Sequence, residues 1–286
     1  MSLVNVLKLI LLSIIWSLGY VFMKNVVPSL GPIWTADLRF LIGGLVLLTY
    51  LKINKSNFNF SENWKKYLII GFLNLALPIA LVSLSLIYIP LSYATIINSL
   101  TPLFSVLSGF FLLKERITPN QVIGIFLGFL GVFFISSKSI HADNSMFLVG
   151  IICCIIASAS FALAGTYIKQ KAKDINSYAM AACSQLFASL VLLPLGVVKL
   201  PTKIFETSIL LNLSALGIIG SALGYIIYYN LIMEIGPSKA LTIMFLIPFF
   251  GMIWGKLFFG EIITLKIILG CFLVLSGTFF VVKKKA

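Results

Sequence analysis

The chain has 286 residues, of which 60% are hydrophobic and only 10% are charged, and its mean hydropathy is +1.11. Soluble globular proteins carry about 25% charged residues, so this chain has too few polar side chains to cover a water-soluble fold. A membrane-spanning helix needs about 20 mainly apolar residues. Ten such spans with short connections would use up the chain, and we therefore predict an all-α integral membrane protein with ten transmembrane helices.

The formal net charge is +13, which in a soluble protein would suggest nucleic-acid binding. Here the lysines lie between apolar runs and at the C-terminus, where basic residues set orientation and contact anionic lipid head groups. The four cysteines lie inside apolar segments without metal-site or disulfide spacing, and His141, the only histidine, lies in a polar loop. We expect no metal, cofactor or nucleic acid. The expected partners are the lipid bilayer and a small-molecule substrate, with the chain acting as a monomer or homodimer.

Apolar runs bounded by charged residues, Pro, Asn or Gly predict the individual spans. The least obvious boundary falls between the third and fourth spans, where only Tyr88, Ile89 and Pro90 intervene. Pro90 removes a helical hydrogen bond there, and one helix over 65–113 would be far too long for a bilayer. The predicted spans are 5–27, 32–51, 65–87, 91–113, 119–137, 146–168, 177–198, 208–232, 238–259 and 264–282.

The distribution of basic residues predicts the orientation. If the N-terminus lies inside, fourteen of the 21 Lys and Arg residues fall in cytoplasmic segments and the others in outer loops or outer helix ends. This excess follows the positive-inside rule and places both termini in the cytoplasm. The first apolar run lacks a signal-peptide cleavage pattern and is interpreted as the first span. We expect the protein in a bacterial inner membrane.

A shift of 146 residues superposes the fourth and fifth spans on the ninth and tenth without a gap. Chance similarity between apolar helices matches Leu with Ile, but not Pro, Glu, Thr and three Gly residues in one register. The matched pairs are Ser92/Ser238, Ala94/Ala240, Pro102/Pro248, Phe104/Phe250, Gly109/Gly255, Glu115/Glu261, Thr118/Thr264, Gly124/Gly270 and Gly131/Gly277. We therefore predict two repeats of five spans, 1–138 and 146–286. Because five is odd, the second repeat enters the membrane in the reverse sense, which is typical of transporters with a site near the midplane.

Further residues carry a resemblance to a known family. They are the doubled Pro…Glu…Thr pattern, the N-terminal series Trp16, Lys24, Pro32 and Arg39, and the run Gly-Ser-Ala-Leu-Gly-Tyr at 220–225. Over essentially the whole chain this sequence resembles the EamA-like branch of the drug/metabolite transporter superfamily. Ser17 departs from the family, which usually has Gly after the Trp. The resemblance implies ten helices, cytoplasmic termini and the transport, often outward, of amino acids or other small metabolites.

Pro102 and Pro248 lie near the centres of the fourth and ninth spans and correspond in the repeat. Proline cannot donate to the carbonyl four residues earlier, so the carbonyls of Asn98 and Met244 lose their usual partners. In lipid these groups need other partners from neighbouring helices, water or ligand. The prolines are interpreted either as packing kinks or as hinges that line a site. Asn98 shares a face with Pro102 and is a candidate cavity residue.

Asn74 in the third span corresponds to Gly220 in the eighth, which Tyr225, Tyr228 and Tyr229 follow closely. An Asn in hydrocarbon is costly unless it is paired, so Asn74 should face the bundle interior or a wet cavity. Tyrosines combine an apolar wall with a hydroxyl group and suit a pocket for a zwitterionic or aromatic metabolite. Alternatively, Tyr228 and Tyr229 belong to an interfacial aromatic belt. Asn74, Tyr225 and Tyr229 are candidate cavity residues.

Trp16 and Tyr20 share a face of the first span, and Phe161 matches Trp16 at a shift of 145 residues. These three aromatic residues are candidate cavity residues that either gate the cavity or pack as ordinary helix side chains. Lys24 corresponds to Lys169 at the same shift. We expect Lys24 to snorkel to the outer interface.

Arg39 lies about two turns into the second span, where an ionisable residue is a functional hypothesis by default. It either attracts an anionic carboxylate of the substrate, pairs with Asp37, or snorkels outward. Glu115 and Glu261 follow the fourth and ninth spans, and each precedes a Thr that is predicted to cap the next helix. Their repetition suggests that each Glu ties consecutive helices together, one on each side of the membrane.

No acidic residue lies near the middle of a span, whereas the small multidrug proteins of the same superfamily use an embedded glutamate to export cations. We therefore predict a secondary transporter of small metabolites, amino acids or related zwitterionic and neutral solutes, that exports by alternating access around a midplane cavity. A multidrug or cation exporter of the same superfamily and a non-transporting scaffold are the alternatives. A membrane-embedded enzyme is disfavoured, because the chain lacks clustered catalytic groups.

Overall fold

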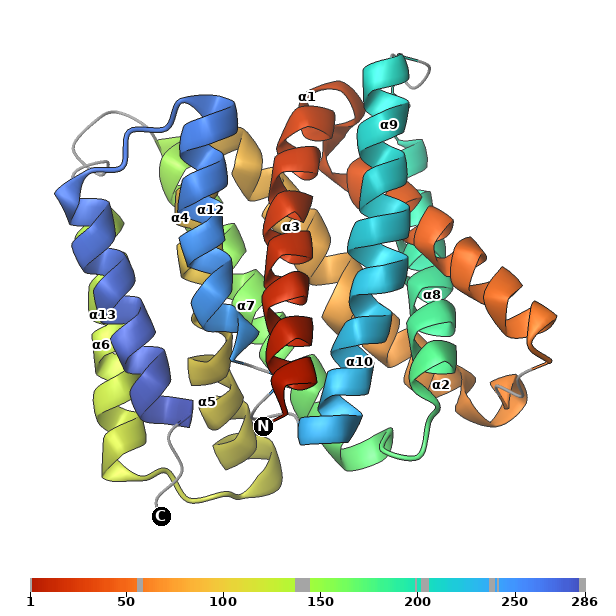
Figure 1. Cartoon of the computed structure of the whole chain (residues 1–286), viewed down its shortest axis with the longest axis horizontal. Coiled ribbons are helices and arrows are strands. Elements are labelled where there is room, and N and C mark those ends of the chain that lie inside the picture. The colour runs from red at the N-terminus through yellow and green to blue at the C-terminus, as the bar shows by residue number, and fades with distance from the viewer. Residues whose placement is uncertain are drawn as a thin grey trace.

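The computed structural model describes residues 2–55, 59–136, 145–198, 200–201, 206–236, 240 and 242–282. These residues form helices joined by short connections, with no strand among them, so the predicted all-α fold is confirmed (Figure 1). Two short π-helical segments, η1 and η3, continue neighbouring α-helices. In chain order the elements are α1 (Leu3–Ile53), α2 (Phe60–Ile70), η1 (Gly71–Ala76), α3 (Leu77–Tyr88), α4 (Leu91–Asn98), α5 (Thr101–Leu113), α6 (Pro119–Ser136), α7 (Ser145–Lys171), α8 (Ser177–Val197), α9 (Thr207–Ala215), η3 (Leu216–Leu223), α10 (Gly224–Ile235), α12 (Ile243–Phe259) and α13 (Leu265–Val282).

Eight helical stretches in this part of the chain are long and apolar enough to cross a bilayer. The first, α1, has 51 residues, which as a straight helix would measure about 75 Å against a hydrocarbon core of about 30 Å. It turns back at Gly31, whose φ of 77° is non-helical, and this position separates the two N-terminal spans that the sequence predicts (Figure 1). Helix α12 is a shorter apolar helix. The membrane fold is confirmed, while the count of ten crossings stays a prediction.

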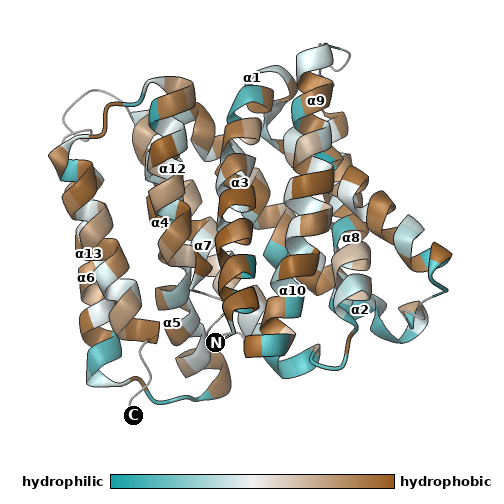
Figure 2. Ribbon diagram, viewed as in Figure 1, coloured by the Kyte–Doolittle hydropathy of each residue, from teal (hydrophilic) through white to brown (hydrophobic). Residues whose placement is uncertain are grey.

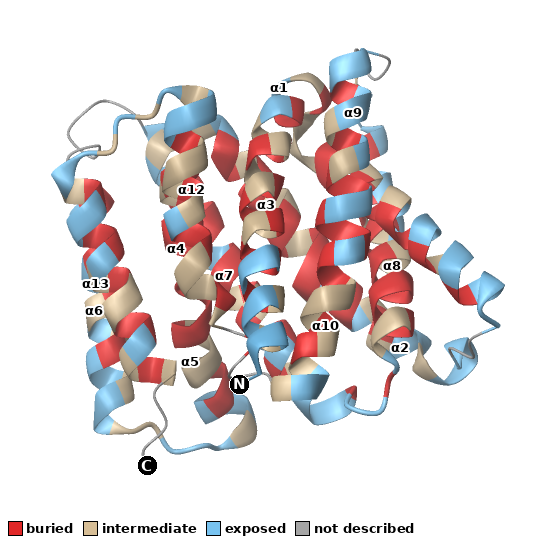
Figure 3. Ribbon diagram, in the orientation of Figure 1, coloured by how far each residue is buried: buried red, intermediate tan, exposed pale blue. Residues whose placement is uncertain are grey.

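The outer faces of the helices are apolar, and the hydrophilic residues gather at the helix ends and in the connections (Figure 2). Large side chains such as Phe111, Phe126 and Phe272 are exposed on these faces. Buried residues lie on the inward faces of the bundle (Figure 3). Such an extensive exposed apolar surface requires lipid rather than water around it.

Proline interrupts the helices at two places near the middle of the first half. Ile89 is extended (φ −125°, ψ 154°) and Pro90 precedes α4, so the predicted boundary between the third and fourth spans is confirmed. The fourth span breaks again after α4, at Ser99, just before Pro102 in the first turn of α5. By contrast, α12 continues through Pro248. The break at Ser99 thus lies three residues before Pro102, whereas α12 begins at Ile243, five residues before Pro248.

The two π-helical segments lie at matching positions of the repeat. Gly71 in η1 corresponds to Gly217 in η3 at the shift of 146. A side chain at Gly71 would collide with the carbonyl of Ser184 in α8, and one at Gly217 with the side chain of Ile42 in α1. Each glycine therefore lets its segment approach a helix of the other half closely. π turns inside helices often occur at functional sites. The segments η1, which contains Asn74, and η3 are therefore candidate parts of a functional site.

Helices α6 and α13, which correspond in the repeat, lie side by side at one edge of the bundle (Figure 1). A Cβ atom added at Gly124 would meet the carbonyl of Gly277, and one added at Gly131 would meet the carbonyl of Gly270. Small residues of this kind allow the backbones of membrane helices to approach closely. The contact is self-complementary, since Gly124 corresponds to Gly270 and Gly131 to Gly277.

Candidate functional site

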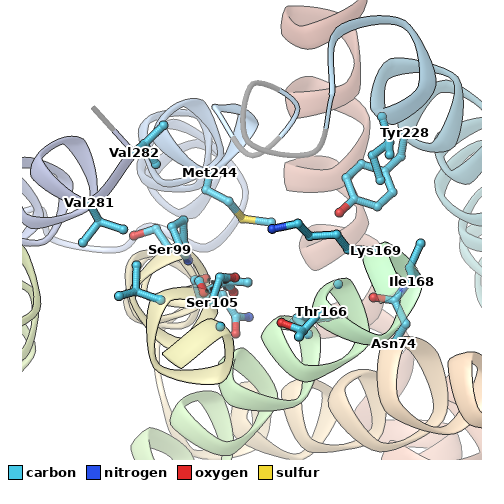
Figure 4. Close-up of a pocket in the computed structure, with 18 of the residues that line it drawn as sticks. Asn74, Ser99, Ser105, Thr166, Ile168, Lys169, Tyr228, Met244, Val281 and Val282 are labelled. Atoms are coloured by element: carbon cyan, nitrogen blue, oxygen red, sulfur yellow. Dashed lines mark hydrogen bonds between the residues drawn. The ribbon is translucent and has the colours of Figure 1, made fainter. Parts of the chain in front are cut away.

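A cavity of about 820 Å³ lies between helices of both halves of the chain. Figure 4 shows Ser99, Ser105, Thr166 and Tyr228 around its open space. Of the residues predicted from the sequence, Trp16, Tyr20, Arg39, Asn74, Asn98, Pro102, Phe161, Tyr225 and Tyr229 all line it. Pro248 is not part of this lining, to which its helix α12 contributes Met244 and Ile247 instead. Residues as far apart in the sequence as Trp16 and Tyr229 are thus brought into one chamber.

Aromatic rings form one wall of the chamber. The ring of Trp16 in α1 lies 5.5 Å from that of Tyr225 and 5.0 Å from that of Tyr228 in α10, measured between centroids. Tyr229 continues the cluster at 5.9 Å from Tyr225. Tyr228 and Tyr229 therefore belong to this interior wall, and the alternative that they form an interfacial belt is wrong. The rings offer a flat apolar surface with hydroxyl groups at its edge.

Asn98, at the end of α4, is fixed between helices of both halves. Its amide nitrogen donates to the hydroxyl of Tyr20 at 2.6 Å, and its amide oxygen accepts from the hydroxyl of Ser158 in α7 at 3.1 Å. The backbone carbonyl of Asn98, which Pro102 deprives of its usual donor, accepts from the hydroxyl of Thr101 at 2.7 Å. The replacement partner is thus a side chain of the same span, and not the neighbouring helix, water or ligand that was expected.

Asn74 forms the corresponding contact from the π-helical segment η1. Its amide nitrogen donates to the hydroxyl of Tyr229 at 3.3 Å, which joins the third span to α10 in the other half. Asn74 is buried and lines the cavity. The position expected for a costly amide in hydrocarbon, paired and facing the interior, is therefore the one observed.

Arg39 lies in the wall of the chamber and is 4% exposed. Its Nε atom donates to the hydroxyl of Ser221 in η3 at 2.7 Å, and Nη1 lies 3.4 Å from the sulfur of Met23. Asp37 instead accepts from the hydroxyl of Ser189 in α8 at 2.7 Å. Residues two apart on a helix do not face each other. The expected Arg39–Asp37 pair and the outward-snorkelling alternative are both wrong.

Sequence reasoning missed the small hydroxyl residues that hold the chamber together. Ser158 fixes Asn98, Ser221 fixes Arg39, and Thr166 in α7 bonds Ser108 in α5 at 2.6 Å. A single Ser or Thr in an apolar run has no periodic signal of its own, because such residues also bond the helix backbone.

Lys24 and Glu261 form an ion pair on the side of the bundle that the chamber lining does not reach. Lys24 Nζ donates to Glu261 Oε1 at 2.9 Å and also lies 4.7 Å from the ring centre of Phe259. The side chains of Lys24 and Glu261 are 20% and 9% exposed. The snorkelling of Lys24 stays a prediction, and the structure adds that its ammonium group pairs with a carboxylate in the connection between α12 and α13.

The same carboxylate caps helix α4. The backbone N–H groups of Leu91 and Ser92 donate to Glu261 at 2.6 and 3.0 Å, where the helix N-terminus favours negative charge. Burial acts to raise the pKa of Glu261, but the hydrogen bonds from Lys24 and Ser92 outweigh it and hold the pKa below its usual value. Glu261 thus ties the turn before α13 to α1 and α4, and not consecutive helices to each other as predicted.

Lys169 and Glu115 form the matching pair at the opposite end, with Lys169 Nζ 2.8 Å from Glu115 Oε1. Here the two side chains are 48% and 53% exposed. Both line the mouth of the cavity together with Arg116 and Lys173. The cavity is therefore open at this end, and its lining does not reach the Lys24–Glu261 pair.

The local structure around both glutamates is the same. Helices α5 and α12 end in residues with left-handed backbone, Lys114 (φ 56°) and Gly260 (φ 63°). The next N–H, that of the glutamate, donates six residues back, to Gly109 at 3.2 Å and to Gly255 at 3.1 Å. The bond reaches one residue farther back than in the Schellman motif, and like that motif it satisfies an orphan carbonyl at the helix end.

Each glutamate side chain also folds back over the glycine that accepts this bond. A Cβ atom at Gly109 or Gly255 would lie 2.8 or 2.5 Å from the carboxylate of Glu115 or Glu261. The repeated Gly and Glu are thus parts of one motif. The Thr caps predicted to follow are confirmed, since Thr118 and Thr264 accept from the N–H groups of Gln121 and Ile267.

The model of the EamA-like transporter family matches the chain twice, over residues 4–137 and 148–283. The chain belongs to the EamA-like transporter family. The resemblance seen in the sequence is confirmed, and the protein is a multi-pass membrane transporter.

Transporters of several organisms are similar to this chain over most of its length. An uncharacterized transporter of Archaeoglobus fulgidus is 28% identical over 94% of this chain and 95% of its own. Uncharacterized transporter YvbV of Bacillus subtilis is 26% identical, over 95% and 89%. A probable amino-acid metabolite efflux pump of Escherichia coli is 21% identical, over 94% and 92%. A crystal structure with 16% identity superposes with a TM-score of 0.71 over 97% of this chain and 96% of its own, and shows the same fold.

Proposed function

We propose that this EamA-like transporter is a secondary transporter that exports amino acids or related zwitterionic and neutral metabolites. The observation that carries the proposal is the chamber of about 820 Å³ between the two halves, whose lining reaches the half-exposed Lys169–Glu115 pair but not the buried Lys24–Glu261 pair. Its size suits a small metabolite. Its lining of tyrosines and asparagines supplies hydrogen bonds beside an apolar wall.

Alternating access between two inverted repeats, 1–138 and 146–286, is the mechanism that fits these features. Corresponding elements face each other across the chamber, and matched Lys–Glu pairs lie at its two ends. If the Lys169–Glu115 pair became buried and the Lys24–Glu261 pair became exposed, the chamber would open to the other side. Pro102, beside the break in the fourth span, and Pro248 are the proposed hinges.

The direction follows from the orientation that the basic residues predict. Arg116, Lys169 and Lys173 line the open mouth, and positive charge favours the cytoplasmic side. In Figure 1 the helix ends at this mouth lie on the same side as the start of α1 and the end of α13. We therefore place both termini and the open mouth in the cytoplasm, with the protein in the inner membrane, which suits loading for export. The efflux activity printed for the Escherichia coli relative supports this direction.

A cationic-drug exporter of the same superfamily is the competing proposal. The chamber gives it little support, since the buried charge in the wall is that of Arg39, a cation, and the acid in the lining is Glu115 at the mouth. The carboxylate of Asp37 bonds Ser189 and does not line the chamber. A positive wall repels cations.

The test is flux in proteoliposomes that contain the purified full-length chain. Labelled amino acids are loaded inside, and their release is measured with and without a pH gradient. We expect saturable release that is absent from liposomes without protein. Transport of organic cations alone would overturn the proposal, and failure of any solute to cross would favour a scaffold.

A further inference from the structure

The charge of Arg39 has no countercharge among the described residues. Its guanidinium group contacts the hydroxyl of Ser221, the sulfur of Met23 and the ring of Phe40, whose centre lies 5.5 Å away. All three are neutral. Among the described acids, Glu115 and Glu261 pair with lysines, and Asp37, which is buried in the same helix as Arg39, accepts from the hydroxyl of Ser189 instead.

An uncompensated charge inside a membrane protein is expensive, and such residues face a cavity or a partner. Arg39 faces the chamber, and its guanidinium has five N–H donors, of which Ser221 and Met23 take two. Nη2 lies toward Gly220, where the missing side chain leaves room. The donors that remain form a planar fork, which matches a carboxylate.

The neighbouring polar groups also offer protons rather than accept them. The hydroxyl of Tyr20 accepts from Asn98, and that of Tyr229 accepts from Asn74. A tyrosine hydroxyl that already accepts a bond still has its own proton to donate. Tyr20 therefore offers a donor to a ligand oxygen, whereas the hydroxyl of Tyr229 also contacts Ser184, whose own proton is donated to the carbonyl of Met180.

Arg39 has no charged counterpart in the second repeat. Position 185 corresponds to Arg39 at the shift of 146, and it holds Gln185, a buried neutral side chain. The chamber therefore has one fixed positive charge at depth and matches a solute with one negative group.

We propose that Arg39 binds a carboxylate group that every good substrate of this chamber carries, and that an amino group on the substrate is dispensable. This inference rests on the proposed transport function and sharpens its substrate class. It makes α-amino acids and simple organic carboxylates ligands of the same site. It excludes amines and amides that lack the carboxylate.

Binding of four related probes tests the inference on the wild-type chain. L-phenylalanine has both groups, 3-phenylpropionate has only the carboxylate, phenethylamine has only the amine, and phenylalaninamide has an amide in place of the carboxylate. Their shared ring suits the aromatic wall of the chamber. Thermal shift of the detergent-solubilised protein reports binding, because a ligand stabilises the folded form by mass action. We expect shifts with the first two probes and none with the others.

Three variants test whether the effect arises from Arg39. Arg39→Gln introduces the side chain found at the corresponding position 185, and Lys52→Gln removes an equal charge at an exposed position outside the chamber lining. We expect Arg39→Gln to weaken binding of both carboxylates about 10- to 100-fold, the usual worth of a charge-assisted hydrogen bond. Lys52→Gln should leave it unchanged, and Arg39→Lys should restore part of it.

The outcomes separate the inference from the proposed function. Equal shifts with phenethylamine or phenylalaninamide, or full carboxylate affinity in Arg39→Gln, would overturn the role of Arg39 while leaving transport intact. The wild-type comparison needs no variant, so misfolding of Arg39→Gln does not remove the test. If a wider panel of carboxylates and their matched amides gives neither shift nor flux, the proposed function and the inference fall together.

Discussion

The two ends of the chamber carry the same pair of residues in different surroundings. Glu261 and Lys24 are largely buried, and the carboxylate also receives two backbone N–H groups of α4. Glu115 and Lys169 lie at the same distance from each other, but both are about half exposed. The helix ends that hold both glutamates are built alike, so the difference arises from how the two halves are arranged around the chamber.

This comparison shows how one local motif can serve as either the closed or the open side of a transporter. Ion pairs of the same chemistry differ in strength mainly through desolvation and additional hydrogen bonds. A rearrangement that buries Glu115 and exposes Glu261 would exchange their contributions without new chemistry. The two states would then be close in free energy, as alternating access requires.

Removing each carboxylate in turn is expected to have the largest effect. Glu261→Gln leaves Lys24 partly buried without a countercharge and weakens the cap of α4, so we expect a loss of about 3 kcal/mol in the free energy of unfolding. Glu115→Gln, the matched variant at the open end, should cost less than about 1 kcal/mol. Unfolding titrations in mixed micelles measure both values.

A second readout of the same variants is access to the chamber. Ser105→Cys, introduced after the four native cysteines have been replaced, puts a reactive thiol in the lining. In the parent it should react only with reagent added at the Glu115 end. Glu261→Gln should add reaction from the opposite side, and equal destabilisation by the two glutamine variants with unchanged labelling would contradict the comparison.

The glycines under the glutamates sharpen the comparison further. Gly255→Ala puts a Cβ atom 2.5 Å from the buried carboxylate of Glu261, whereas Gly109→Ala puts one 2.8 Å from the carboxylate of Glu115. The buried side chain has no room to move, so Gly255→Ala should destabilise by about 1–3 kcal/mol. Glu115 can swing into solvent, and Gly109→Ala should stay within about 0.5 kcal/mol. Thermal unfolding of the two alanine variants measures both losses of stability. A larger loss in Gly109→Ala would contradict the tighter packing around Glu261.

Much of this architecture could be predicted from the sequence because lipid leaves so few choices. Apolar length fixed the helical class and the boundary at Pro90. The repeat identified Glu115 and Glu261 as corresponding residues. The cost of polar groups in hydrocarbon predicted that Asn74 and Asn98 face the interior. These signals depend on a residue and its position along one helix.

What the sequence could not supply was the partner of each polar group. Lys24 and Glu261 lie 237 residues apart, and nothing local to either residue indicates that they meet. The same is true of Arg39 and Ser221. The signal was nevertheless present in outline: Lys24 corresponds to Lys169 and Glu115 to Glu261, so two opposite charges recur together. The difference between the two ends is a property of one conformation, which the repeat by itself does not encode.

The protonation of Glu261 offers a smaller test. Its pKa is lowered from the ordinary 4.5, so its contribution to stability is present above that value and is lost as the pH falls through the lower pKa of the folded state. The difference in unfolding midpoint between wild type and Glu261→Gln should therefore be constant near neutral pH and shrink in acid. Thermal unfolding from about pH 7 to pH 3 measures this, and a difference that grows in acid would show that the carboxylate is not held charged.

The smallest expected effect concerns the two amides inside the chamber. Asn98 makes hydrogen bonds to Tyr20 and Ser158, whereas Asn74 makes one longer bond to Tyr229. Asn98→Ala should weaken binding of a transported amino acid about fivefold, close to the net worth of one hydrogen bond, and Asn74→Ala about twofold. Isothermal titration with the best solute from the flux assay measures both.

The unequal loss has a structural reason that extends the comparison of the two ends into the chamber. Asn98 lies directly before the break in the fourth span, at the end of the helix that Glu261 caps. Its position therefore depends on closure of the Glu261 end, while Asn74 is held by its own π-helical segment. If the ends are coupled to the site in this way, Glu261→Gln should reduce the loss of binding affinity caused by Asn98→Ala. It should leave the loss caused by Asn74→Ala unchanged. A double-mutant cycle measures both couplings. Unchanged binding by Asn98→Ala alone would remove this residue from the site.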